Sequence, residues 1–168
     1  MQKKLKANAK EQFRQDDWPL ETVIHDGGMA KIFRTIGVVG DSLSSGAMAY
    51  QGAGEESKQI NADMYECWIQ YMARYCSSTA YNFSTSGMGT DSFFRSPYYD
   101  LMMDGQHLFQ AYFIALGHND HDRSVPIGAP EDVNLKNWDN NAKTFIGNYA
   151  RIISSIQSIQ PTAKILGL

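Results

Sequence analysis

Cysteine is scarce in this sequence, and long apolar runs are absent. The only two cysteines of the 168 residues are Cys67 and Cys76, which fall within one predicted helix. Their spacing of nine residues corresponds to about 13.5 Å along a helix, which is too long for a disulfide without breaking that helix. We therefore expect two thiols in a reducing compartment, with the cytoplasm as the expected location. No apolar segment is long enough to span a bilayer, and none follows the N-terminal lysines as a signal peptide requires.

The chain also has little excess charge of either sign. Fifteen basic and 18 acidic side chains give a net charge of -3 at pH 7, which provides no general attraction to nucleic acid or to an anionic membrane. The basic patch over residues 1–10 contains no aromatic side chain, and we interpret it as a solvated terminal segment. We therefore expect no nucleic-acid partner and no membrane span. An apolar fraction of 43% over this length is typical of one globular domain.

Apolar periodicity predicts an irregular lead-in over residues 1–31 and an α/β domain over residues 32–168. Four segments are predicted as buried strands, near residues 32–40, 80–86, 108–117 and 163–168. Helical spacing or loop composition marks the segments between them: helices over residues 57–75 and 142–159, a helical turn in 91–105 and a polar loop over 118–137. This alternation predicts a three-layer, flavodoxin-like parallel sheet with helices on both faces.

Three of the predicted strands end in glycine and small polar residues. These ends are Gly40-Asp41-Ser42, Ser86-Gly87 and Gly117-His118-Asn119-Asp120. Ligands bind beyond the carboxyl ends of the strands in a parallel sheet, so the three ends should meet at one site. A serine hydroxyl there can act as a nucleophile, while backbone N–H groups and an asparagine amide can hold a developing oxyanion. Ser42, Gly87 and Asn119 are therefore the predicted catalytic residues.

The same three strand ends carry a family resemblance. The segments GDSLSSG, NFSTSGMGT and ALGHND, at residues 40–46, 82–90 and 115–120, resemble the first three sequence blocks of the SGNH hydrolases, the GDSL-type esterases and lipases. The resemblance covers residues 32–168. It implies a hydrolase that removes an acetyl or other acyl group from a small-molecule, carbohydrate or lipid ester. It implies no metal and no organic cofactor.

The resemblance also implies a role for each residue. Ser42 is the nucleophile, and its backbone N–H, the backbone N–H of Gly87 and the side-chain amide of Asn119 form the oxyanion hole. Asp41 is expected to brace the turn rather than to transfer a proton. The other common serine-hydrolase turn, G-x-S-x-G, would require glycine at position 44, where this chain has Ser44.

One part of the family pattern has no counterpart in this sequence. The general base of these hydrolases comes from a late Asp-x-x-His block, which follows a further strand. The sequence stops at Leu168 inside an apolar segment, which is a poor place for a natural terminus. We therefore expect a domain that is incomplete at its C-terminus and lacks its catalytic His and Asp. Such a chain should be nearly inactive by itself and prone to self-association through an exposed sheet edge.

Histidines within the chain offer three candidates for a substitute base. His107 belongs to Asp104-x-x-His107, which has the family's spacing, but it precedes a strand. It is therefore predicted at the opposite edge of the sheet from Ser42. His118 and His121 are predicted much nearer to Ser42, which makes them the first candidates.

Two other functions fit parts of the same pattern. The segment GHNDHD, residues 117–122, resembles a strand end of metal-dependent phosphoesterases, but the Asp-x-His expected at a first strand is absent. The segment GVVGDSLSSG, residues 37–46, could hold a phosphate in a non-catalytic, flavodoxin-like ligand-binding module, although it lacks the Walker lysine.

The aromatic segment after the second strand end has two interpretations. Its aromatic side chains are Phe93, Phe94, Tyr98 and Tyr99. They line an acyl or sugar cleft in one interpretation and pack beneath a loop in the other.

Overall fold

The computed structural model describes residues 28–50, 58–60 and 67–168. It separates into two units, Met1–Ile32 and Phe33–Leu168, and each is described by itself. The described part of the first unit is one 3-10 turn, η1 (Gly28–Ile32). The second unit contains a sheet, the helices that cover it and the predicted site residues.

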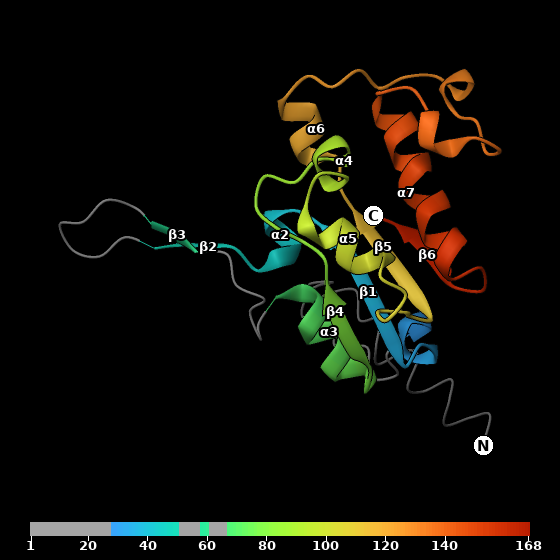
Figure 1. Cartoon of the computed structure of the whole chain (residues 1–168). Coiled ribbons are helices and arrows are strands. Elements are labelled where there is room, and N and C mark those ends of the chain that lie inside the picture. The colour runs from blue at the N-terminus through green and yellow to red at the C-terminus, as the bar shows by residue number, and fades with distance from the viewer. Residues whose placement is uncertain (1–27, 51–57, 61–66) are drawn as a thin grey trace, which may run out of the picture. The chain divides into compact units, whose positions relative to one another are not determined.

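Four parallel strands form one sheet in the second unit, as the sequence predicts (Figure 1). The strands are β1 (Thr35–Gly40), β4 (Thr79–Asn82), β5 (Ala111–Ala115) and β6 (Lys164–Gly167), in the order β4-β1-β5-β6. In the middle of the sheet, Ile36 of β1 is level with Ala80 of β4 and with Ala111 of β5. The carboxyl ends of these three strands therefore meet at the same edge of the sheet.

Helices cover both faces of this sheet, and its two inner strands, β1 and β5, are accordingly buried on both faces. The helices are α2 (Ser42–Ser45), α3 (Trp68–Cys76), α4 (Thr90–Phe93), α5 (Pro97–Met103), α6 (His118–Asp122) and α7 (Phe145–Ile159). Successive side chains of β1 enter different core clusters: Val39 packs in the cluster that contains Met102 and Ile152, and Val38 packs in the cluster that contains Ile69. The helices α5 and α7 thus cover one face and α3 the other, which confirms the predicted three-layer fold.

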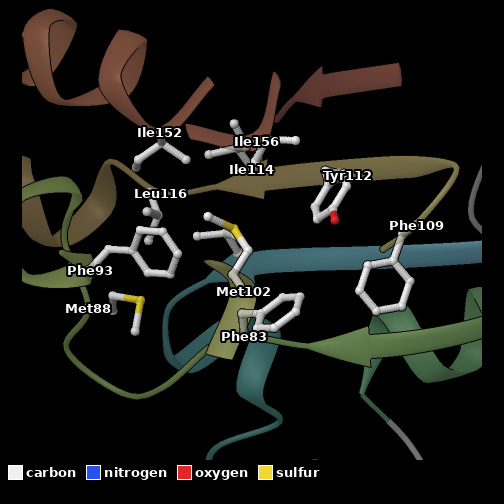
Figure 2. Close-up of a cluster of buried hydrophobic side chains, with 11 residues drawn as sticks. Phe83, Met88, Phe93, Met102, Phe109, Tyr112, Ile114, Leu116, Ile152 and Ile156 are labelled. Carbon is white, nitrogen blue, oxygen red and sulfur yellow. The ribbon is translucent and has the colours of Figure 1, made fainter. Parts of the chain in front are cut away.

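The larger cluster lies between the sheet and the helices α5 and α7 (Figure 2). Tyr112 and Ile114 of β5 are completely buried in it, together with Phe83. The rings of Phe83 and Phe109 meet edge to face with their centroids 5.9 Å apart, an arrangement that aromatic pairs prefer. This core holds the carboxyl ends of the strands in place from one side.

The predicted helix over residues 57–75 is wrong in its first part. Lys58–Ile60 forms the short strand β3, which pairs antiparallel with β2 (Met48–Tyr50), and helix α3 begins only at Trp68. Only one of these three residues, Ile60, is apolar, so periodicity does not assign them, and backbone pairing with β2 gives them a strand conformation. Residues 61–66 lie outside the described residues.

The predicted polar loop over residues 118–137 is also wrong at its start. Residues His118–Asp122 form the short helix α6, which begins directly after β5. Gly117, with φ of 137°, makes the sharp turn out of the strand, and its carbonyl accepts the N–H of His121. Small polar residues suggested a loop, but a tight strand-to-helix turn is equally compatible with them. The helix predicted over 142–159 is confirmed from Phe145 onward as α7, which begins three residues later than predicted because the Thr144 side chain caps it.

The structure describes both cysteines and most of the chain over which no membrane span is expected. Cys67 and Cys76 lie at the two ends of α3, both are buried, and no disulfide joins them. Over residues 28–50, 58–60 and 67–168, no helix has the length and apolar character needed to cross a membrane.

Ile114 provides a test of the core. Replacing Ile114, which is completely buried, with alanine should lower the free energy of unfolding by about 2–5 kcal/mol, because it leaves a cavity. Ile127 is 73% exposed, so Ile127→Ala should change stability by less than about 0.5 kcal/mol. Urea unfolding followed by circular dichroism measures both variants. Equal losses in the two variants would contradict the position of β5 in the core.

Candidate active site

A tight turn joins the end of β1 to the short helix α2 and carries Ser42 at its start. Asp41 precedes the helix, and its carboxylate accepts the backbone N–H of Leu43 at 3.0 Å. This is an N-cap, which satisfies a helix donor that otherwise has no partner. Gly46 then ends α2 in the left-handed conformation, with φ of 69°. The prediction that Asp41 braces the turn is confirmed.

Ser44 connects the turn to two distant residues through hydrogen bonds. It is 1% exposed, and its hydroxyl accepts the indole N–H of Trp68 at 3.2 Å. Its carbonyl accepts the side-chain amide of Asn82 at 2.7 Å. A Cβ on Gly40 would lie 2.5 Å from the Ser44 Cβ and closer still to its hydroxyl. Glycine at position 40 therefore permits the close return of the chain that positions Ser42.

Ser42 itself differs from its two buried neighbours. It is half-buried, whereas Ser44 and Ser45 are buried. Among the described residues, its hydroxyl takes part in no hydrogen bond, while its carbonyl accepts the N–H of Ala47 at 3.0 Å. Ser42 therefore presents an uncommitted hydroxyl at the carboxyl end of the central strand.

Gly87 lies in a β-turn that follows β4. The turn is closed by the N–H of Met88, which donates to the carbonyl of Thr85 at 3.2 Å. Gly87 has φ of 75°, the conformation that the third residue of a type II turn requires. The turn bond does not use the N–H of Gly87, so this group is available as a donor.

Asn119, on α6, connects the other two predicted site residues. Its side-chain amide donates to Asp41 Oδ2 at 3.2 Å and to the carbonyl of Met88 at 3.0 Å. Asp41 is bonded to Ser42 in the chain, and Met88 to Gly87. The structure therefore brings Ser42, Gly87 and Asn119 together at one end of the sheet, as the strand-end argument predicts.

Asp120, next to Asn119, is committed to a structural contact. It is 3% exposed, and its carboxylate accepts the N–H of Thr90 at 2.9 and 3.0 Å and the hydroxyl of Thr90 at 2.6 Å. Both oxygens are thus occupied by one residue. No group of three or more histidine, cysteine or acidic side chains suited to a metal is found in the part of the chain that the structure describes.

The histidine candidates for a base lie at opposite ends of β5. His107 precedes β5, at the amino end of the strands, and its ring lies 3.0 Å from Asp104 Oδ2. This pair is therefore at the far edge of the sheet from Ser42, as predicted. The backbone N–H of Gln106, which donates to Asp104, lowers the pKa of that carboxyl below its usual value.

The other two histidines are on α6. His118 Nε2 lies 3.5 Å from Asp122 Oδ2, and the ring of His121 lies 3.7 Å from Asp122 Oδ1. The His121 side chain is 91% exposed. None of the described histidines is hydrogen-bonded to Ser42, although His118 lines a cleft beside the serine turn.

Residues of α6 contribute to the lining of two clefts. The first, with a volume of about 350 Å³, is lined by Asp41, Leu43, Ser44, Trp68, Ala115, Leu116, His118 and Leu168. The second, of about 430 Å³, is lined by Gly117, Asp120, His121, Ser124, Val125, Ile127 and Phe145. The first adjoins the turn that carries Ser42, and most of its lining is apolar.

The aromatic segment after Gly87 contributes to the core instead of a cleft. Phe93 is completely buried, and Phe94 and Tyr99 pack against it with ring centroids 6.0 and 5.6 Å away. The guanidinium of Arg151, on α7, lies 4.0 Å from the centre of the Phe94 ring. These contacts support the packing interpretation.

Several residues that shape the site carried no sequence signal. Trp68 and Asn82 are hydrogen-bonded to Ser44. Thr90 is hydrogen-bonded to Asp120 of α6, and Arg123 to the carbonyl of Gly87. Thr90 is the first residue of α4, but its partner Asp120 lies 30 positions further along the chain. All four residues reach the site through contacts between distant segments, which spacing does not reveal.

Comparisons with known proteins identify one matching family. Residues 36–166 match the profile of a family described as GDSL-like Lipase/Acylhydrolase. No curated protein is significantly similar to the chain in sequence.

The chain is also similar in structure to solved proteins of low sequence identity. A protein from Bacteroides uniformis ATCC 8492, described as a GDSL-like lipase, is 17% identical with a TM-score of 0.58, over 80% of this chain and 70% of that one. A family two carbohydrate esterase from Clostridium thermocellum, in complex with cellohexaose, is 20% identical with a TM-score of 0.53, over 80% and 42%. A possible lipase from Chitinophaga pinensis DSM 2588 is 20% identical with a TM-score of 0.49, over 79% and 47%. The chain thus spans 70% and 42% of the first two of these proteins, and the likeness to them is one of fold.

Gly40 provides a test of the serine turn. Gly40→Ala should lower the free energy of unfolding by about 1–3 kcal/mol, because the added methyl group overlaps a buried serine that cannot move away. Gly105, with a positive φ but open space around its Cα, is a control in which alanine adds backbone strain alone. Thermal unfolding measures both, and a larger loss at Gly105 would contradict the close approach at Gly40.

Proposed function

The chain belongs to the GDSL-like lipase/acylhydrolase family, and on that premise we propose that it is an esterase in which Ser42 is the nucleophile. The observation that carries the proposal is the pair of hydrogen bonds from the Asn119 amide to Asp41 and to Met88. They bring a hydroxyl and candidate donors from three strand ends to one place. Acyl transfer requires this combination of groups.

In the proposed reaction, the Ser42 hydroxyl attacks the carbonyl carbon of the ester and passes its proton to a general base. The carbonyl oxygen becomes an oxyanion, and the tetrahedral intermediate collapses when the base returns the proton to the leaving alcohol. Water, activated by the same base, then attacks the acyl-serine and releases the carboxylic acid. Ser42 is regenerated unchanged.

Three donors are proposed for the oxyanion. As the first residue of α2, Ser42 has a backbone N–H without an acceptor inside the helix. The N–H of Gly87 is not used by its turn. The amide of Asn119 uses both of its hydrogens in the free protein, so it must exchange one bond for the oxyanion. Met88, whose neutral carbonyl accepts one of them, is the weaker partner.

The family resemblance implies that an Asp-x-x-His block supplies the base. The described residues offer no histidine hydrogen-bonded to Ser42, and His118 is the first substitute to test because it lines the cleft beside the serine turn. A loss of activity in His118→Ala equal to that in Ser42→Ala would assign the base to His118.

The proposed substrate is an ester whose alcohol is a carbohydrate, a lipid or another small molecule. The family description supports lipid and other acyl esters. The likeness in fold to a carbohydrate esterase crystallised with cellohexaose supports an acylated carbohydrate. Comparing hydrolysis of acetylated oligosaccharides with hydrolysis of glycerol esters separates the two classes.

Self-association also stays a prediction. The described sheet has β4 and β6 as its edge strands, and unpaired strand edges favour pairing between chains. Light scattering on the purified 168-residue chain should give a mass above that of the monomer. A monomer at all concentrations would contradict the prediction.

The catalytic roles are tested by substitution in the full-length protein with p-nitrophenyl acetate as substrate. Ser42→Ala should abolish turnover, and Asn119→Ala should lower kcat by about 10²–10³, the effect expected for loss of one oxyanion donor. Circular dichroism checks that both variants fold.

Ser158 and Asn140 are exposed and far along the chain from the site, so Ser158→Ala and Asn140→Ala are matched controls with unchanged kcat. Full activity in Ser42→Ala would overturn the proposal. Activity that instead depends on added divalent metal would favour a metal-dependent phosphoesterase.

A further inference from the structure

Three side chains of α6 and its C-cap are hydrogen-bonded to the loop from Gly87 to Thr90. Asn119 donates to the carbonyl of Met88 at 3.0 Å, and Asp120 accepts the N–H and the hydroxyl of Thr90. Arg123, at the end of α6, donates through Nη2 to the carbonyl of Gly87 at 2.6 Å. Side chains of one short helix therefore fix three of the four residues of this loop.

The Asp120 contact holds the C-terminal end of the loop. Thr90 is the first residue of α4 and is completely buried, and both of its donors go to one buried carboxylate. Charge-assisted bonds of this kind are stronger and more directional than bonds between neutral groups. A Cβ on Gly89 would lie 3.0 Å from Asp120 Oδ2, so the loop also packs tightly against the carboxylate.

The Arg123 contact holds the N-terminal end of the same loop. Arg123 donates to the carbonyl of Gly87, whose positive φ lies in the region that glycine adopts most easily. Within the described residues, the Arg123 guanidinium has no acidic partner, and the Gly87 carbonyl is the one acceptor of its side chain. The charged guanidinium of Arg123 therefore restrains the peptide group that follows Gly87.

We propose that Asp120 and Arg123 are positioning residues for the oxyanion hole. They act through the Gly87–Thr90 loop and hold the Gly87 N–H at a fixed place relative to the Asn119 amide. Neither touches the reacting atoms. The inference rests on the proposed function, because it assigns these residues to the site in which Gly87 and Asn119 are donors.

Order at Gly87 can be measured without any enzymatic activity. In ¹⁵N relaxation experiments on the 168-residue chain, Arg123→Ala should lower the order parameter of the Gly87 amide to the range of flexible backbone, below about 0.6. Amides of β1 and β5 should stay rigid. The exposed Arg95 pairs only with Asp91, so Arg95→Ala is the matched control and should leave Gly87 unchanged. An unchanged Gly87 amide in Arg123→Ala would overturn the proposal.

Kinetics in the full-length protein test the consequence. Arg123→Ala should lower kcat on the order of 10-fold and Asp120→Asn on the order of 10²-fold, because misplaced donors lose transition-state stabilisation. KM should change little, since the loop does not bind the ground state. Asp91→Asn is the control for loss of one carboxylate near the same loop.

A double-mutant cycle distinguishes positioning from general stability. If Arg123 acts through the oxyanion hole, Arg123→Ala should cost less kcat in the Asn119→Ala background than in the wild type. Equal costs in both backgrounds would contradict positioning. Loss of activity in Ser42→Ala together with full kcat in Arg123→Ala would overturn this inference alone, whereas full activity in Ser42→Ala would overturn the proposed function itself.

Discussion

The buried carboxylate of Asp41 is the group on which the geometry of the site depends. It is 3% exposed, one oxygen caps the serine helix at Leu43, and the other accepts the amide of Asn119. A buried charge without such partners would cost several kcal/mol, so the folded state retains both bonds. Because Asn119 also bonds to Met88, one carboxylate and one amide join three strand ends.

The layers of the fold were predictable because their signals are local. The two inner strands, β1 and β5, are buried on both faces, and α7 shows helical spacing up to Ile159, shortly before Pro161. The first part of the segment before α3 was not predictable, because the pairing of Met48 with Ile60 depends on a partner outside that segment. Helix α6 was missed because its five residues are too few to show any periodicity.

The sequence predicted which residues of the site lie near one another, but not the hydrogen bonds that connect them. Parallel strands place Ser42, Gly87 and Asn119 at one edge of the sheet whatever the side chains do. The bond from Arg123 to Gly87 spans 36 positions in the sequence and that from Thr90 to Asp120 spans 30. Both depend on a helix that the sequence did not predict, so no spacing rule could have found them.

The central position of β1 has a consequence for synthesis of the protein. Ile36 pairs with Ala80 and with Ala111, which lie 44 and 75 residues further along the chain (80 − 36 and 111 − 36). At roughly 5–20 residues per second, a ribosome delivers the second partner about 4–15 s after β1 has emerged. During that interval one edge of β1, whose residues Ile36–Gly40 are buried in the finished fold, lacks its partner strand. The serine turn takes its final shape only after β5 and the Asn119 that follows it have been made.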